Sequence, residues 1–414
     1  MVNKMTLCNE NLTNFFESLH KEEWREVRLG EVGKVITGKT PSQNNPQDWG
    51  DSMLFITPTD YKNYCKYASD SARKISNEGV DRFSRIVLPP NSVLVTCIGS
   101  DMGKVAINKV QAITNQQINA IIPNNMINYN FLYYSLVDMY PILRIFGTDG
   151  TAVPILNKND FESLTISLPP LPIQNQIAEI LSSFDDKIDL LHRQNQTLES
   201  LALTLFRHHF IENPNCNEWE KTTLENICLK IQSGGTPSTK QHSYYGGNIN
   251  WYSTKELNDN FLFKSIQQIT DEGLNNSSAK LFPKDSVIIA IYASPTVGRL
   301  GILTQESAFN QAACGLVVDE TKSSKEFVFL FLKNERENLN LLASGSAQQN
   351  LNVEKIKNYP LLLPDKETLD YFQIQAKGFF DKISHNAKEI LALEQMRDLV
   401  LSKIFNEKME VRSE

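Results

Sequence analysis

Residues 33–40, GKVITGKT, match the phosphate-loop pattern G-x-x-x-x-G-K-[ST], whose chemistry is nucleotide binding and hydrolysis. In such a loop a helix begins directly after the motif, because its backbone N–H groups and N-terminus must face the phosphates. Residues 41–50 are instead PSQNNPQDWG, and their two prolines do not permit a helix of any length. The sequence therefore argues against ATP binding at this motif.

The histidines and cysteines could supply metal ligands or nucleophiles. No two of the six cysteines form a C-x-x-C pair, so we expect idle thiols and neither a zinc site nor a disulfide framework. His208 and His209 fall at the end of a helical segment, where a solvated role or an interaction with the helix dipole is the common one. These residue types predict no metal site.

The two halves of the chain repeat each other. TGKTPS (37–42) returns as SGGTPS (233–238), and Trp24 corresponds to Trp219. Across most of the chain, matching positions of the two halves differ in number by 194–196 residues, as Asn115-Gln116 and Asn310-Gln311 do. A shift this constant indicates a duplicated unit of about 195 residues.

The repeat tests each possible catalytic motif, because a shared mechanism would need both copies. The second copy of the phosphate-loop stretch is LKIQSGGT (229–236), which lacks the first glycine and the lysine. PDKE (364–367) hints at a nuclease but corresponds to PPLP, and no histidine has a counterpart in the other half. We therefore expect no catalytic residues, and the feature common to both halves is a polar Gly-Thr-Pro turn after a short strand.

Each half ends in a long helical segment, 172–210 and 368–405, in which apolar residues recur in alternating steps of four and three. This heptad pattern is typical of a coiled coil. Two equivalent helices in one chain pair most simply antiparallel, and a two-fold axis near residue 193 would place Asn195 against Asn386. We predict that this buried asparagine pair sets the register of the coil. The alternative is two amphipathic helices on separate cores.

Length and composition are consistent with two or three domains in an ordinary globular chain. The 414 residues are 41% hydrophobic and 21% charged, with a net charge of −7. No run of about 18 apolar residues is present, and the N-terminus carries polar residues where a signal peptide needs an apolar centre. We expect a cytoplasmic protein without a membrane segment.

Polar turns in each domain could contact base edges or phosphates, because amides recognise adenine and Arg or Lys recognises guanine or phosphate. The alternative for Asn115-Gln116 and Asn310-Gln311 is that they cap or bridge backbone, and for the Gly-Thr turns that they are plain turns. The first domain offers Lys39, Thr40, Thr57, Thr59, Lys62, Lys104, Asn115, Gln116 and Gln117. The second offers Thr236, Ser253, Lys255, Arg299, Asn310, Gln311, Gln348 and Gln349.

Over nearly its whole length the chain resembles the specificity subunits of type I restriction-modification enzymes. The resemblance rests on W-x-x-x-x-L-x-x-[IV] followed by G-x-T-P in each half, and on GTAVPILN (150–157) with GSAQQNLN (345–352). The most specific match is ISLPPLPIQNQIAEILSSFDDKI (166–188). The second half departs from the family there, since LLLPDKETLDYFQIQAKGFFDKI (361–383) lacks the L-P-P-x-x-x-Q form.

The resemblance implies an α+β fold with two repeated target-recognition domains, each built on a mixed β-sheet, joined by two long helices in an antiparallel coiled coil. Each domain would recognise one half of a bipartite, asymmetric site in double-stranded DNA. The helices would set the spacer and dock two methyltransferase subunits, and restriction subunits would join them. The chain itself would be non-catalytic and without a cofactor, and S-adenosylmethionine, ATP and Mg would bind to the partner subunits.

The predicted boundaries follow the repeat. An N-terminal segment, 1–20, would complete the end of the coil, and the other parts are 21–170, 171–212, 213–365 and 366–410 for domain, helix, domain and helix. We also expect short helices near 129–144, which Pro141 breaks or kinks, and near 325–342. A non-catalytic two-headed scaffold for proteins or other ligands, and a stand-alone nucleotide-dependent enzyme, remain alternative hypotheses.

Overall fold

The computed structural model describes residues 15–16, 19–63, 66–145, 155–292, 296–344 and 351–405. It divides into two compact units, of which the first comprises residues 1–189 and 393–414 and the second residues 190–392. Most of the predicted N-terminal segment, 1–14 and 17–18, lies outside the described residues. In the described part of the chain, no helix has the length and apolar character needed to cross a membrane.

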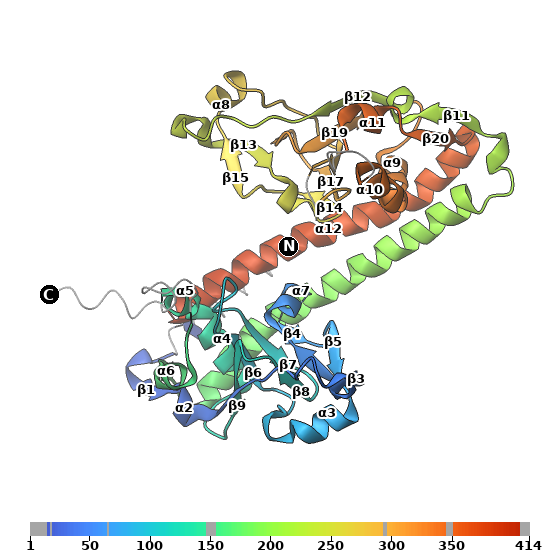
Figure 1. The fold of residues 1–414 in the computed structure, drawn as a ribbon. Helices are drawn as coiled ribbons and strands as arrows, with labels where there is room; N and C mark the ends of the chain where they lie inside the picture. The colour runs from blue at the N-terminus through green and yellow to red at the C-terminus, as the bar shows by residue number, and fades with distance from the viewer. Residues whose placement is uncertain are drawn as a thin grey trace. The chain divides into compact units, whose positions relative to one another are not determined.

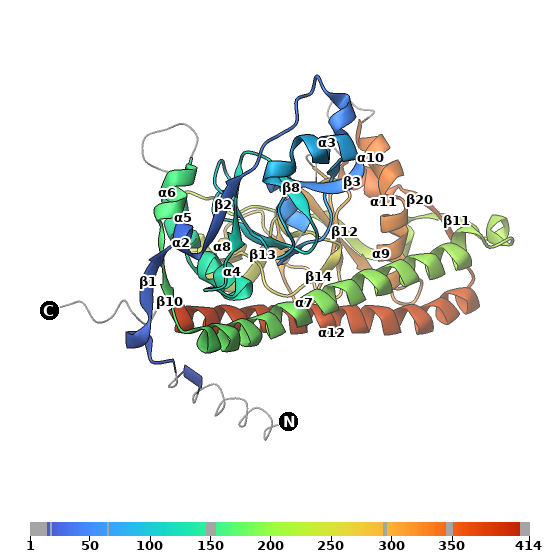
Figure 2. The same cartoon turned by 90° about the horizontal axis from the view of Figure 1, so that it is seen from below.

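The first unit is built on a five-stranded sheet in the order β2-β9-β6-β7-β4 and a three-stranded sheet in the order β5-β3-β8, with a two-stranded pair of β1 and β10 (most strands are labelled in Figure 1, β2 and β10 in Figure 2). Its strands are β1 (Arg25–Arg28), β2 (Gly33–Thr37), β3 (Trp49–Ile56), β4 (Tyr67–Ala68), β5 (Arg73–Ile75), β6 (Val93–Thr96), β7 (Val105–Asn108), β8 (Ala112–Thr114), β9 (Ile118–Pro123) and β10 (Thr165–Leu168). Its shorter helices are η1 (Lys21–Glu23), α2 (Leu29–Val32), η2 (Pro46–Asp48), η3 (Pro58–Asn63), α3 (Asn77–Arg82), η4 (Ser84–Ile86), α4 (Tyr129–Asp138), α5 (Tyr140–Ile145) and α6 (Lys158–Ser163).

The second unit repeats this topology strand for strand, with sheets β12-β19-β16-β17-β14 and β15-β13-β18 and the pair β11-β20. Its strands are β11 (Glu220–Thr223), β12 (Cys228–Ser233), β13 (Tyr245–Tyr252), β14 (Asn260–Leu262), β15 (Gln267–Ile269), β16 (Val287–Ala290), β17 (Leu300–Leu303), β18 (Ala308–Phe309), β19 (Ala313–Val318) and β20 (Pro360–Leu363). Its shorter helices are η6 (Cys216–Glu218), η7 (Leu224–Ile227), η8 (His242–Tyr244), η9 (Thr254–Glu256), α8 (Asp271–Asn275), α9 (Lys325–Asn334), α10 (Arg336–Ser344) and α11 (Val353–Lys357). The duplication seen in the sequence is therefore a duplication of fold.

The larger sheets of both units are mixed. Each five-stranded sheet has three antiparallel pairs and one parallel pair, and each three-stranded sheet has one pair of each kind. In the three-stranded sheets β3 runs antiparallel to β5 and parallel to β8, and β13 does the same with β15 and β18. The phosphate-loop stretch is part of this framework: β2 covers its first five residues and pairs with β9 from Gly33 to Thr37. The next helical element is the three-residue η2, so the motif is a strand and a turn.

Two long helices, α7 (Leu171–Phe206) and α12 (Lys366–Phe405), are the most extended elements, and Figure 2 shows them lying alongside each other. In the second unit Asn195 of α7 meets Asn386 of α12, and further along Phe206 meets Phe372, so the two helices run antiparallel. Asn386 Nδ2 donates to Asn195 Oδ1 over 2.9 Å, and both side chains are buried. The contact that the heptad register predicts is present. After α7 the chain continues as one π-helical turn, η5 (Arg207–Ile211).

The helices pack on the sheets differently in the two units. In the first unit a buried polar network joins them: Lys66 Nζ donates to Ser182 Oγ over 2.8 Å, and Arg397 donates to Asp185 over 2.8 Å. Tyr134 completes it, because its hydroxyl donates to Asp185 over 2.5 Å and accepts from Lys66 over 3.2 Å. Burial lowers the pKa of Lys66 to about 8, against the opposing effect of Asp185.

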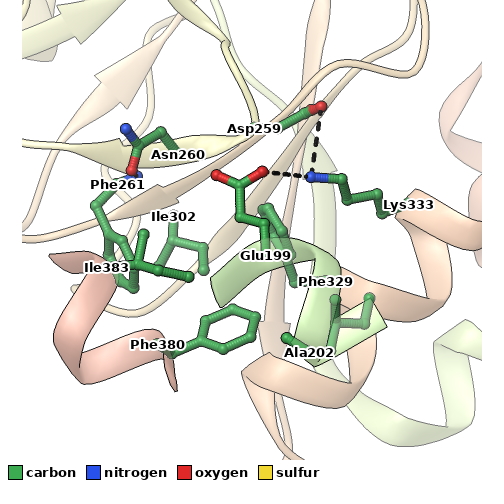
Figure 3. A pocket seen from close by; sticks show the side chains of 11 residues that line it. Glu199, Ala202, Asp259, Asn260, Phe261, Ile302, Phe329, Lys333, Phe380 and Ile383 are labelled. Carbon is green, nitrogen blue, oxygen red and sulfur yellow. Dashed lines mark hydrogen bonds and ion pairs between the residues drawn. The ribbon is translucent and has the colours of Figure 1, made fainter. Parts of the chain in front are cut away.

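In the second unit the corresponding place is mostly apolar. The repeat puts Asn260, Leu330, Phe380 and Ala202 where the first unit has Lys66, Tyr134, Asp185 and Arg397. These four residues line a small apolar cavity, with an ion pair at its edge between Lys333 and Glu199, 2.9 Å apart (Figure 3). The two units therefore share a fold and differ in the chemistry that attaches the long helices.

Candidate nucleic-acid interface

The Gly-Thr-Pro turn of the first unit packs against the segment that links β8 to β9. Lys39 N donates to Thr114 O over 2.9 Å, and Thr40 Oγ1 donates to Gln116 Oε1 over 2.6 Å. Asn115 is buried and folds onto Gln117, since its Nδ2 donates to Gln117 Oε1 over 2.8 Å and its Oδ1 accepts from Gln117 N over 3.1 Å. The turn and the Asn-Gln-Gln segment thus form one polar cluster, in which Lys39 and Gln116 are exposed.

The second unit has the same cluster. Gly235 N donates to Phe309 O over 2.9 Å, and Thr236 Oγ1 donates to Gln311 Oε1, as Thr40 does to Gln116. Asn310 N donates to Tyr252 O over 2.9 Å, which ties the Asn-Gln pair to the end of β13. The alternative that the asparagine caps backbone therefore has direct support for Asn115, whose Oδ1 accepts from Gln117 N, while Gln116 and Gln311 lie on the surface.

Glycine is required at the start of each turn by the close approach of two backbones. A Cβ atom on Gly38 would lie 2.2 Å from Thr114 O, and one on Gly234 would lie 2.1 Å from Phe309 O. No side chain fits at that distance, so the G-x-T-P signature is explained by packing. The resulting turn presents the following Thr to the Gln of the neighbouring segment.

A carboxylate fixes the segment after the central strand of each three-stranded sheet. Asp60 Oδ2 accepts from Thr57 N and Thr57 Oγ1 over 2.8 and 2.7 Å, while Oδ1 accepts from Ala72 N over 3.0 Å. Asp60 is only 2% exposed. The hydroxyl of Thr57 is thus engaged in holding the backbone.

Glu256 makes the same three bonds in the second unit. Its Oε2 accepts from Ser253 N and Ser253 Oγ over 2.8 and 2.9 Å, and its Oε1 accepts from Ile266 N over 2.8 Å. We name the two arrangements the carboxylate clamps. Sequence reasoning selected Thr57 and Ser253 but missed Asp60 and Glu256, although the spacing [ST]-x-x-[DE], typical of a capping box, is present in both halves.

The clamps hold the short strands β5 and β15, each of which is an edge strand in its sheet. Arg73 lies on β5 with its guanidinium 3.3 Å from the centre of the Trp49 ring, and the two residues line an open groove of about 370 Å³. Lys74 pairs with Asp70 over 3.3 Å. A hydrogen bond from the Ser71 backbone, and to a smaller extent the nearby Lys74, holds the pKa of the Asp70 carboxyl below its ordinary value. Sequence reasoning did not select these residues.

The other sequence-predicted residues are dispersed over the units. Lys104 is exposed and pairs with Asp101 over 2.6 Å, and Arg299 lies partly buried just before β17. Thr59 and Lys255 are exposed on η3 and η9, beside the clamps. The side chain of Lys62 and the whole of Gln348 and Gln349 lie outside what the structure describes.

A model of the protein family described as "Type I restriction modification DNA specificity domain" matches the chain twice, at residues 21–200 and 217–394. These matches coincide with the repeated topology and cover most of the chain. The chain belongs to this family. It is a type I restriction-modification specificity subunit with two target-recognition domains, and each domain carries its own polar turn cluster and carboxylate clamp.

Other specificity subunits resemble this one over nearly their whole length. The MjaIX specificity subunit of Methanocaldococcus jannaschii is 28% identical over 406 residues, covering 92% of this chain and 93% of its own. The MjaVIII specificity subunit of the same organism is 24% identical and covers 96% of each chain. The crystal structure of a type I S subunit from M. genitalium has the same fold, with a TM-score of 0.57 at 14% identity, covering 93% of this chain and 96% of that one.

Proposed function

We propose that this specificity subunit recognises a bipartite, asymmetric site in double-stranded DNA, with one target-recognition domain on each half-site. The observation that carries the proposal is a repeated fold with unlike polar residues at equivalent places. Identical domains would suit a palindrome, whereas Lys39 with Gln116 and Gly235 with Gln311 present different groups on the same framework. The two half-sites therefore differ in sequence.

We assign the long helices two tasks, setting the number of base pairs between the half-sites and docking two methyltransferase subunits. The length of α7, 36 residues, corresponds to about 54 Å of helix, which exceeds one turn of DNA at about 34 Å. Leu168 and Gln174 of the L-P-P-x-x-x-Q segment are buried, so the candidate docking surfaces are the exposed residues at this start of α7 and at the equivalent start of α12.

We assign the chemistry to the partner subunits, so that this chain is a non-catalytic subunit of an adenine methyltransferase and endonuclease in the cytoplasm. Methyltransferase subunits would bind S-adenosylmethionine, and restriction subunits would use ATP and Mg. The net charge of −7 is compatible with this division, because partner subunits can supply much of the contact with phosphates.

Methylome sequencing tests the proposal. Cells with and without the chain are compared, and we expect one bipartite methyladenine motif to disappear when the chain is absent. An unchanged methylome, in cells where the methyltransferase subunits are expressed, would contradict the proposed function.

A further inference from the structure

The edge strands β5 and β15 occupy the same place in the two target-recognition domains but carry different side chains. In register, Arg73 pairs with Phe55 and Lys74 with Leu54, while Gln267 pairs with Trp251 and Gln268 with Asn250. The pair Arg-Lys of the first domain is thus replaced by Gln-Gln in the second. The strand ends are alike, since Ile75 and Ile269 are both fully buried.

The backbone around these side chains is fixed in the same way in both domains. Besides the carboxylate clamps, Ser71 Oγ accepts from Phe55 N over 3.2 Å, and Ser265 Oγ accepts from Trp251 N over 3.1 Å. A serine and a carboxylate therefore hold the segment before each edge strand at two points. A constant framework that presents variable side chains is what two domains with one docking mode and different targets require.

Arg73 is exposed and preorganised. Its guanidinium lies against the Trp49 ring, an arrangement that restricts the side chain by cation–π attraction while leaving the edge of the fork open. Within the described residues, no hydrogen bond or ion pair occupies that fork. An Arg fork with free N–H groups can donate two parallel bonds to O6 and N7 of guanine in the major groove.

Gln267 is exposed at the equivalent position, and its amide can bind N6 and N7 of adenine in the same bidentate manner. Beside it, Ile266 is 85% exposed, where the first domain has the smaller Ala72. An aliphatic side chain at the surface of a base-contacting strand suits the methyl group of thymine. Gln268 is not equally available, because its Nε2 donates to Asn250 Oδ1 over 3.2 Å.

The acidic residues near β5 distinguish a base contact from a general phosphate contact. Asp51 lines the same groove as Arg73, and Asp70 neutralises Lys74. Two carboxylates would repel the phosphate backbone, whereas a carboxylate can accept a hydrogen bond from the amino group of cytosine. The groove therefore suits the edges of base pairs.

We propose that β5 and β15 are the base-recognition strands of this subunit, with Arg73 contacting guanine in one half-site and Gln267 contacting adenine in the other. This inference rests on the proposed function. It adds which residues determine specificity and which base each of them selects.

The test exchanges the two residues. The chain, co-purified with the methyltransferase subunits of its own system, selects duplexes from a library with randomised positions, and bound duplexes are sequenced. Arg73→Gln should change one guanine to adenine in one half of the motif, and Gln267→Arg should change one adenine to guanine in the other half. Binding of the original site should fall by about 5- to 150-fold in each variant.

Arg85→Gln is the matched control, because it removes the same charge from an exposed position on η4, and the motif should not change. If the unaltered complex selects no bipartite motif, the proposed function itself fails. If it selects one and the exchanged variants select the same one, the assignment of β5 and β15 fails. A variant that unfolds at the normal temperature but loses affinity for all duplexes equally would make Arg73 a general contact and also overturn the assignment.

Discussion

The buried carboxylate of Asp60 accepts three hydrogen bonds, so its removal should lower the stability of the folded chain. In Asp60→Ala, the backbone N–H groups of Thr57 and Ala72 lose their acceptor while staying partly out of water. We expect a loss of about 3 kcal/mol in the free energy of unfolding, measured by urea denaturation, because bonds to a charged group contribute about 1.5–3 kcal/mol each and are not additive.

Asp51→Ala is the control for this prediction, since Asp51 is an exposed aspartate on β3, the strand that precedes the clamp. Its effect should stay within about 0.5 kcal/mol. Equal effects of the two substitutions would show that the clamp does not hold the edge strand.

Lys66 predicts a dependence of stability on pH. Its pKa in the folded state is about 8, below the ordinary 10.5, because burial disfavours the charged form. Between these two values the unfolded chain binds the proton that the folded chain has lost, so rising pH favours folding by up to about 1.4 kcal/mol per pH unit. Tyr67 acts in the opposite sense only above pH 10, since burial raises its pKa to about 12.

The measurement is urea unfolding of the unaltered chain and of Lys66→Met from pH 7 to pH 9.5. The free-energy difference between them, unaltered minus variant, should increase with pH above about 8. Parallel curves over that range would contradict the prediction.

At the level of residues the sequence indicated the turn clusters but not the whole site. Gly38, Thr40 and Gln116 were found because their types and spacing recur in the second half. Arg73 and Gln267 were missed because a search for recurrence discards positions that differ. They could have been found by looking for two adjacent residues that differ between the halves beside residues that match, as in ARKIS (72–76) and IQQIT (266–270).

Among the elements, the asparagine pair of α7 and α12 allows a direct test of how much stability is lost by burying two amides in the seam. Asn386 is fully buried, and within the described residues neither Asn195 Nδ2 nor Asn386 Oδ1 finds a hydrogen-bond partner. Asn386→Leu alone leaves Asn195 with further unpaired groups and should lower stability by about 1–3 kcal/mol. The double variant with Asn195→Leu should recover this loss and exceed the unaltered chain, because two apolar residues suit the seam better.

A double-mutant cycle by urea denaturation measures the coupling. Gln196→Leu, at an exposed position of the same helix, is the control and should change stability by less than about 0.5 kcal/mol. Additive effects of the two asparagine substitutions would show that the pair does not specify the register.

Long elements were predictable from sequence, and short ones were not. A heptad pattern that continues over five turns favours a paired coil over two helices on separate cores, so both long helices and their antiparallel contact could be predicted from it. The strands β4, β5, β15 and β18 have two or three residues each, which is too short for a period of two to be visible. Their places are fixed by pairing with distant strands, as with Phe55 and Arg73.

On the scale of the whole molecule, each unit contains an equivalent aromatic cluster, but the chain connects the members of the two clusters differently. In the first unit Trp24, Phe131 and Phe405 lie together, with ring centres 5.8–6.5 Å apart. In the second, Phe210 lies 6.0 Å from Trp219 and 5.0 Å from Phe327. Phe210 and Trp219 are joined by eight residues, 211–218, whereas Phe405 and Trp24 belong to opposite ends of the chain.

This equivalence predicts that the order of the two halves can be permuted. Joining Phe405 to Leu19 through three residues restores the same eight-residue spacing to Trp24, and the bond from Lys21 Nζ to Lys403 O, 3.0 Å, shows that the two segments already meet. New ends are made between Pro214 and Asn215, which are both exposed. Residues 211–218 already make a connection of this length between the equivalent residues of the second unit. The permuted chain should therefore fold with its melting temperature within about 5 °C of the original.

Calorimetry and selection from the same duplex library check the permuted chain. It should select the unaltered motif, since no residue of β5, β15 or their clamps is changed. A control with the same junction, opened instead between Leu94 and Val95 in the fully buried strand β6, should not fold, because it divides a central strand. If neither permuted chain folds, the segments around Phe405 and Leu19 are not equivalent to the connection at 211–218. The structural repeat would then be limited to the sheets of the two units.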